Sequence, residues 1–180
     1  VAPELWNDWK AALLATIFLR TLRAIEVRSP PEAIAREAAR RRRAAVEAQL
    51  GHEVSAAEIG RHFAAMPPRY FLAFEPPQIA HHLCLIPRLA GAPFALDLYH
   101  NTAIGYTELI VVTRTRVGLF SEIAGTLASR GINILSAQIH TRTDGVAIDT
   151  FRVNEGGAGA GPILDAARWY YALSHLDPAQ

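Results

Sequence analysis

The chain has 180 residues, of which 51% are hydrophobic and 19% are charged, and its formal net charge is +1. This composition is typical of a folded globular protein and argues against intrinsic disorder. The small net charge gives no overall field that would attract nucleic acid, and no apolar run is long enough to span a membrane. The single cysteine, Cys84, excludes an intrachain disulfide. We therefore expect a cytoplasmic protein with neither nucleic acid nor a membrane as a partner.

The first part of the chain has the pattern of helices. Ser29-Pro30-Pro31-Glu32 is typical of a helix start, and Gly51 is typical of the residue that ends such a helix. Before this second helix, an earlier one is predicted between about residues 4 and 27. Its apolar stripe consists of Leu5, Trp6, Trp9, Leu13, Ile17 and Leu22.

Two more helices are predicted before residue 92. Ser55 and Glu58 repeat the capping pattern and predict a short helix that ends before Pro67. Residues 75–77, Glu-Pro-Pro, open a fourth helix that should stop near residue 90. Proline cannot donate an interior hydrogen bond, so Pro87 predicts a kink or an early end of this helix.

From residue 93 onward the pattern changes from helical to alternating. Strands are predicted where apolar residues alternate or run continuously, and helices where helical spacing returns. Residues 156–161 are rich in glycine and predict a flexible linker. The expected order is strand 93–100, strand 108–114, helix 118–129, strand 132–141, strand 146–153 and helix 162–174.

This order predicts an α+β protein with two parts. Residues 1–92 form an N-terminal helical segment, and residues 93–180 form a ferredoxin-like βαββα(β) domain. A βαββαβ domain requires one more strand after its last helix, so we expect this domain to lack its last strand. Strand 93–100 is expected to fill part of that gap by pairing beside strand 107–114, because an open sheet edge is a liability for a lone domain.

Catalytic motifs are absent from the sequence. Two-metal nucleotidyl transfer needs closely spaced carboxylates that hold Mg²⁺, and there is no Asp-x-Asp. Hydrolases of the HD type need a His-Asp dipeptide, and none of the seven histidines precedes an aspartate. The pairs His81-His82 and His52/His62 lack metal-ligand spacing, so we interpret them as surface or hydrogen-bonded histidines. We expect no catalytic residue, metal ligand or cofactor in this chain.

The most basic stretch consists of four consecutive arginines, Arg40 to Arg43. Consecutive residues on a helix point in different directions, and no aromatic residues alternate with these arginines. Glu37 and Glu47 partly neutralise the run. We interpret it as a solvated helix face, with contacts to phosphates or to an acidic partner surface as the alternatives.

The turn into helix 118–129 is the strongest candidate binding site. Gly118 allows close approach of a ligand to the backbone, and the first amides of the helix, at Gly118, Leu119 and Phe120, can receive a carboxylate. Asn133 begins the next strand and offers both a donor and an acceptor, as an amino acid requires. The alternative is that Gly118 only eases the turn and that Asn133 only caps the helix end.

The chain resembles the ACT domain family in segments 108–112, 118–124, 131–134, 137–139, 144–145 and 149–151. Residues 144–153 are similar, more specifically, to the first ACT domain of the bifunctional uridylyltransferase/uridylyl-removing enzyme family. Leu5-Trp6-Asn7-Asp8-Trp9-Lys10 and residues 70–82 resemble the helical segment between the hydrolytic HD domain and the ACT pair of that family. Because the sequence also begins with Val1 and not with methionine, we expect a fragment of a longer chain.

The resemblance implies a regulatory role without catalysis in this chain. Enzymes of that family attach UMP to the nitrogen-regulatory PII protein and remove it, and glutamine bound to their ACT region favours removal. The implied ligand is glutamine or another amino acid, the implied partner of the whole enzyme is the PII protein, and Mg²⁺ is the cofactor expected for catalytic domains outside this chain. Homo-oligomers through the sheet edges are expected as well.

The predicted ligand-binding residues are Thr115, Gly118, Leu119, Phe120 and Asn133. The family usually carries Asp-x-Pro in the loop before the helix, and Thr115 and Val117 stand at those positions here. This loop therefore offers no carboxylate to the ammonium group of a ligand. The alternative function is an ACT module that regulates or oligomerises another amino-acid-controlled enzyme.

Overall fold

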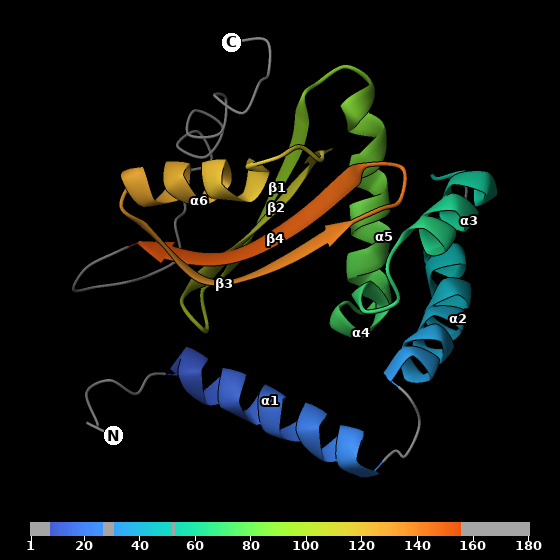
Figure 1. Cartoon of the computed structure of the whole chain (residues 1–180), viewed down its shortest axis with the longest axis horizontal. Coiled ribbons are helices and arrows are strands. Elements are labelled where there is room, and N and C mark those ends of the chain that lie inside the picture. The colour runs from blue at the N-terminus through green and yellow to red at the C-terminus, as the bar shows by residue number, and fades with distance from the viewer. Residues whose placement is uncertain (1–7, 27–30, 52, 156–180) are drawn as a thin grey trace.

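The computed structural model describes residues 8–26, 31–51 and 53–155 and is a mixed α+β structure (Figure 1). The predicted elements within these ranges appear in the predicted order, and one further short helix, at residues 70–73, was not predicted. The predicted linker and helix at 156–174 lie outside the described residues. The helical segment contains α1 (Asp8–Glu26), α2 (Pro31–Leu50), α3 (Ala56–Ala65), α4 (Tyr70–Ala73), α5 (Pro76–Leu85) and the 3₁₀ helix η2 (Ile86–Ala90). The sheet domain contains β1 (Phe94–Asn101), β2 (Tyr106–Arg114), α6 (Leu119–Ser129), β3 (Ile132–Thr141) and β4 (Val146–Glu155).

The strands form one antiparallel sheet in the order β1-β2-β4-β3. Because β2 and β3 both run antiparallel to β4, they run parallel to each other on its two sides. β1 pairs along the outer edge of β2, as predicted. A complete βαββαβ unit places its last strand at that edge. Within the described residues no strand follows β4, so β1 occupies this place and the sheet edges are β1 and β3.

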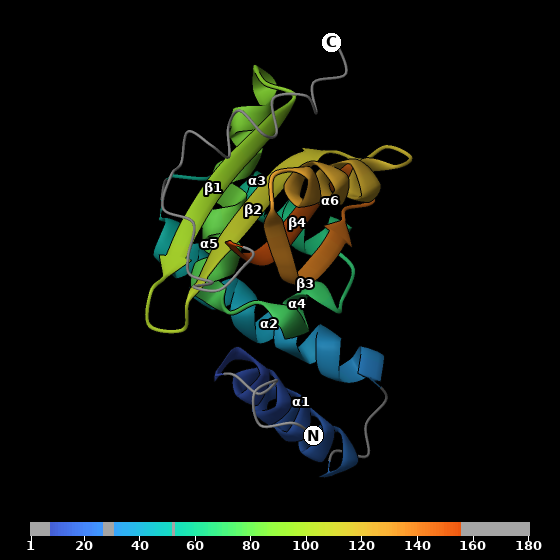
Figure 2. The same ribbon diagram turned by 90° about the vertical axis from the view of Figure 1, so that its left-hand side faces the viewer.

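The two faces of the sheet carry separate cores, because alternate residues of a strand point to opposite sides. On one face, Leu119, Ile123 and Leu127 of α6 pack against strand residues that include Leu109 and Phe151. The opposite face is covered by the helical segment, as Figures 1 and 2 show. This second core joins the two parts of the chain and includes Tyr70, Phe71, Ile79, Leu83, Ile110, Val112 and Ile148.

Local signals explain where the helices under the sheet begin and end. Ser55 caps α3, since its Oγ accepts a hydrogen bond from the N–H of Glu58 at 3.2 Å. Glu75 and Gln78 form a capping box at the start of α5. Beyond Leu85 the chain continues as the 3₁₀ helix η2, in which Pro87 has no N–H to donate. The early end predicted for this helix is confirmed.

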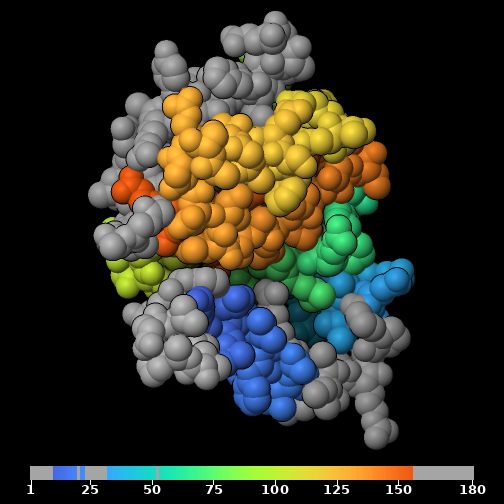
Figure 3. Space-filling view, turned by 60° about the vertical axis from the view of Figure 1, so that its left-hand side comes forward, coloured from blue at the N-terminus to red at the C-terminus, as the bar shows by residue number. Residues whose placement is uncertain are grey.

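The apolar stripe of α1 is exposed to solvent. Leu13, Ile17 and Leu22 are 40% to 51% exposed, and Figure 3 shows α1 below the face that α6 and β3 form. The side chains of the other stripe residues, Leu5, Trp6 and Trp9, lie outside the described part. Helical spacing therefore predicted the helix correctly, but the described residues cover little of its apolar side. Every helix in the described ranges is too short or too polar to pass through a lipid bilayer.

Arg42 departs from the solvated face predicted for the arginine run. Arg40, Arg41 and Arg43 are exposed, as expected. Arg42, with a side chain 17% exposed, donates hydrogen bonds to the carbonyl of Phe71 and to Glu75 Oε1, the latter at 2.7 Å. It therefore ties α2 to α4 and to the start of α5, a structural role that depends on residues about thirty positions away.

Candidate functional site

A cavity of about 240 Å³ lies at the end of the sheet where β2 leads into α6. Its volume corresponds to about eight water molecules, which suits a small metabolite. Four of the five predicted ligand-binding residues line it: Thr115, Gly118, Leu119 and Phe120. The remaining wall comes from Arg116, Ser121, Ile139, Thr141, Ala147 and Asp149.

Gly118 sets the direction of the amides at the start of α6. Its φ of +82° lies in the left-handed region, which glycine adopts without a steric penalty. The N–H of Leu119 donates to the carbonyl of Arg116 at 3.3 Å, so the prediction of a free amide is wrong there. Within the described residues the N–H groups of Gly118 and Phe120 have no acceptor. Together with the helix dipole, these two amides favour an anionic group in the cavity.

The loop before α6 is fixed to the hairpin between β3 and β4. The N–H of Thr115 donates to the carbonyl of Gly145 at 2.8 Å, which holds Thr115 at the cavity wall. Val117 is fully exposed and does not line the cavity. Arg116 Nη1 lies 2.5 Å from Glu122 Oε1 in the first turn of α6, so these two charges neutralise each other at the rim.

Asn133 lies at the opposite end of the sheet from Gly118. It pairs with Asn154, whereas the cavity residue Thr141 pairs with Ala147 at the other end of the same two strands. At about 3.3 Å per strand residue, Asn133 is about 26 Å from Thr141 along β3. The structure therefore does not bring Asn133 to Gly118, and one small molecule cannot contact both within a single chain.

Asp149 is a cavity residue that the sequence reasoning missed. It lies on β4 opposite Ile139 and Val111, is 1% exposed, and its Oδ1 has no hydrogen-bond partner within the described residues. Burial raises the pKa of Asp149 to about 6, against a smaller lowering by the backbone N–H of His140. The signal that could have revealed it is its alternation with Ala147 and Phe151, which places a carboxylate on the apolar side of a strand.

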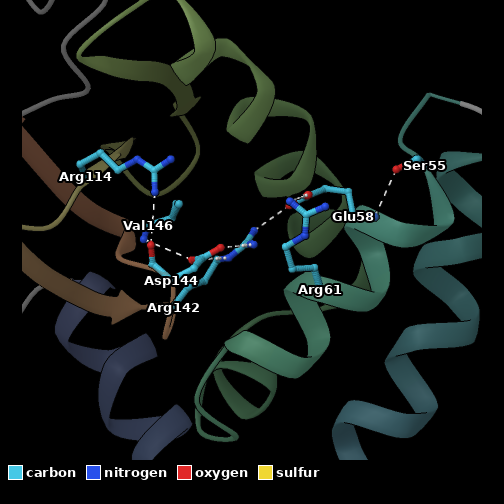
Figure 4. A network of polar contacts seen from close by, with 7 residues as sticks. All are labelled: Ser55, Glu58, Arg61, Arg114, Arg142, Asp144 and Val146. Atoms are coloured by element: carbon cyan, nitrogen blue, oxygen red, sulfur yellow. Dashed lines mark hydrogen bonds and ion pairs between the residues drawn. The ribbon is translucent and has the colours of Figure 1, made fainter.

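A buried ionic cluster beside the cavity connects the sheet to the helical segment (Figure 4). Arg142, whose side chain is 1% exposed, holds Asp144 through two hydrogen bonds of 3.0 and 2.6 Å. Its third contact is a hydrogen bond of 2.8 Å to Glu58 of α3. Burial alone would raise the pKa of Asp144, but the hydrogen bonds and charge of Arg142 hold it below its ordinary value. The N–H of Thr143 also donates to the carbonyl of Ala65 at 3.0 Å.

Three histidines are buried between the helical segment and the sheet. Burial lowers the pKa of His62 and His82 to about 3 and that of His140 to about 4, so all three are neutral at pH 7. Tyr70 OH lies 2.7 Å from Nδ1 of His82. His62 differs from the expected hydrogen-bonded histidine, because neither ring nitrogen has a partner within the described residues.

The other histidine pairs do not form a metal centre in the described part of the chain. His81 is exposed, with Nε2 2.8 Å from Asp97 Oδ2, and His52 lies outside the described residues. Across residues 8–26, 31–51 and 53–155, no group of three or more His, Cys, Asp or Glu side chains is arranged to hold a metal ion.

Comparison with known proteins gives consistent matches over both parts of the chain. The profile of the ACT domain family matches residues 107–168. The bifunctional uridylyltransferase/uridylyl-removing enzyme of Azospirillum brasilense is 35% identical over 164 residues, which are 88% of this chain and 17% of that enzyme. The enzyme of the same name from Vibrio parahaemolyticus is 34% identical over 176 residues, 97% of this chain and 20% of that enzyme.

The chain thus spans between 16% and 20% of the length of the curated relatives that it matches. The matched region includes the helical segment as well as the sheet, and it contains the ACT domain. Over most of its length the chain is therefore similar to one region of the bifunctional uridylyltransferase/uridylyl-removing enzymes, and that region contains an ACT domain.

Proposed function

We propose that this chain is the regulatory, amino-acid-sensing region of a uridylyltransferase/uridylyl-removing enzyme, and that its ligand is glutamine. It reports glutamine to the catalytic domains and thereby controls modification of the PII protein in nitrogen assimilation. The observation that carries the proposal is the cavity at the start of α6 in an ACT domain. Its volume and its two free amides suit the carboxylate of a small amino acid.

The buried cluster around Arg142 supplies a route for the signal. Thr141 lines the cavity and directly precedes Arg142, and Thr115 lines it and is bonded to Gly145 in the same hairpin. A ligand that shifts either wall acts on the hairpin that Arg142 fastens to Glu58 of the helical segment. The signal requires that the ligand bind two arrangements of these parts with different affinities.

Catalysis is assigned to domains outside this sequence. Nucleotidyl transfer with Mg²⁺ and the hydrolytic removal of UMP would both take place there, and we assign no catalytic residue or cofactor to this chain. The proposal places the protein in the cytoplasm, where the free thiol of Cys84 stays reduced.

Assembly through the sheet edge is the second candidate function. β3 is an edge strand of ten residues, and its residue Ile139 is 37% exposed. Unpaired strand edges form hydrogen bonds with further strands, including those of a second copy. In this alternative the ACT domain joins chains and needs no amino acid.

Thermal unfolding of the 180-residue chain tests the proposal. L-Glutamine at ten times its Kd would add about 1.4 kcal/mol to the free energy of unfolding. For a chain of this size, that raises Tm by about 3 to 6 °C. We expect a saturable rise with L-glutamine and no rise with D-glutamine, which is the matched control.

Thermal unfolding with the other common amino acids, together with a sedimentation experiment, distinguishes glutamine sensing from another ligand specificity and from assembly. A rise with a different amino acid, but not with glutamine, would identify an ACT module of another specificity. Concentration-dependent dimers with no response to any amino acid would favour assembly and contradict sensing.

A further inference from the structure

Asp149 is a buried carboxylate that the backbone N–H of His140 satisfies only in part. Its neighbours on the α6 face of β4 are Ala147 and Phe151, and it is 1% exposed. Its Oδ1 lacks a hydrogen-bond partner within the described residues. A buried acceptor without a partner destabilises the folded state, and does so more strongly when it is charged. An apolar residue would pack better at this position, so the carboxylate calls for a functional reason.

The cavity presents opposite electrostatic character at two places. The free N–H groups of Gly118 and Phe120 and the dipole of α6 favour a negative group. The carboxylate of Asp149 favours a positive one. Arg116 and Glu122 are paired with each other at the rim. A molecule with an anionic and a cationic group a few bonds apart therefore matches this cavity.

We propose that Asp149 receives the ammonium group of an amino acid whose carboxylate lies on the amides of Gly118 and Phe120. This inference rests on the proposed function and adds the residue that selects for an α-amino group. It also accounts for the loop before α6, where Thr115 and Val117 offer no carboxylate. The strand under the helix supplies the negative charge instead, so one chain contains both halves of the site.

If Asp149 had only a structural role, its replacement by asparagine would have a different effect on stability and on ligand preference. If its carboxylate only stabilised the dipole of α6, Asp149→Asn would lower the free energy of unfolding and would not change the preference for amino compounds. If it binds a ligand cation, the variant keeps or gains stability at neutral pH and loses that preference.

Titration calorimetry on the 180-residue chain provides the test, with L-glutamine and its deaminated analogue 4-carbamoylbutanoate as probes. We expect the wild type to bind L-glutamine at least tenfold more tightly than the analogue, which lacks only the α-amino group. Asp149→Asn should weaken L-glutamine binding at least tenfold and abolish the discrimination. The control Asp97→Asn removes a carboxylate from the opposite face of the sheet and should bind like the wild type.

The pH profile gives a second readout that does not depend on the variant. Around Asp149 on the α6 face, β2 presents Val111 and β3 presents Ile139, both uncharged, and the charges nearest along the cavity are Arg116 and Glu122. Burial raises the pKa of Asp149 to about 6. Wild-type affinity should therefore fall about tenfold from pH 7 to pH 5, while the affinity of Asp149→Asn stays constant.

The outcomes separate the inference from the proposed function. Equal binding of L-glutamine by wild type and Asp149→Asn overturns the role of Asp149 and leaves glutamine sensing in place. Equal affinity of the wild type for L-glutamine and 4-carbamoylbutanoate does the same without any variant. If the wild type binds no amino acid, both are overturned.

Discussion

Arg142, in the hairpin after β3, donates a hydrogen bond of 2.8 Å to Glu58 of α3, although 84 positions separate the two residues in the sequence. The Arg142 side chain is 1% exposed and that of Glu58 is 17% exposed. Water therefore screens this ion pair poorly, and each partner depends on the other. Because of this contact, the ACT hairpin and the helical segment cannot move independently of each other.

Removal of Arg142 should destabilise the chain strongly. Arg142→Met leaves Glu58 and Asp144 without their buried partner, and we expect a loss of about 3 kcal/mol in the free energy of unfolding. The control is Arg61→Met, because Arg61 also pairs with Glu58, at 3.0 Å, but is 62% exposed. It should cost less than about 0.5 kcal/mol. Urea denaturation gives the free energy of unfolding of both variants. Equal losses in the two variants would contradict a special contribution of the buried Arg142 ion pairs.

Acid should destabilise the contact between the sheet and the helical segment. The pKa of His62 is about 3 in the folded state and about 6.5 in the unfolded chain, so the unfolded chain takes up the proton first. The stability is therefore present above pH 6.5 and is lost as the pH falls toward 3. For one such histidine the loss at pH 5 is about 2 kcal/mol.

The variant His62→Phe tests this assignment. It keeps an aromatic ring beside Tyr70 and removes the titrating group. The difference in unfolding free energy between pH 7 and pH 5, measured with urea, should shrink by about 2 kcal/mol. His81→Asn, at an exposed position, should leave the difference near that of the wild type. A pH dependence that His62→Phe does not change would show that His62 does not carry the effect.

Asp149→Asn should stabilise the protein without ligand. The pKa of Asp149 is raised from 3.8 to about 6 by burial, so its stabilising contribution is present below pH 3.8 and is lost as the pH rises through 6. The asparagine variant avoids that loss, and its gain should reach about 2 to 3 kcal/mol at pH 7.5. At pH 4 the gain should fall to about 0.6 kcal/mol. A variant less stable than the wild type at pH 7.5 would argue for a structural role of the carboxylate.

Gly118, the N-cap residue of α6, and Gly125, inside α6, should respond in opposite directions to the same substitution. Gly118→Ala places a Cβ at φ +82°, and we expect a loss of about 1 to 2 kcal/mol. Its nearest neighbour would be Glu122 Oε1 at 3.9 Å, so the loss comes from the backbone and not from a clash. Gly125→Ala lies inside the helix with open space around it and should gain about 0.5 to 1 kcal/mol. Chemical denaturation gives both values. If Gly118→Ala left the free energy of unfolding unchanged, this would contradict the left-handed backbone conformation of Gly118.

Local patterns were sufficient to predict most of the described helices and strands, although not α4. Alternating or continuous apolar residues predicted β1 to β4, and the capping residues Ser55 and Glu75 marked helix starts, because these signals act within a few positions of the chain. The ACT profile matches the region in which residues 108–151 resemble ACT domains, and the curated relatives match most of the chain. Four of the predicted ligand-binding residues line one cavity because they are neighbours in one turn.

Contacts between distant residues could not be predicted in this way. The register of β3 and β4 decides that Asn133 lies at the far end of the sheet from Gly118, although the two flank the same helix. The same register places Asp149 at the cavity and brings Arg142 near α3. A strand pattern specifies which side chains share a face, whereas strand direction and helix packing specify which ends meet. The sequence by itself therefore determined the elements, and the tertiary structure decided the composition of the site.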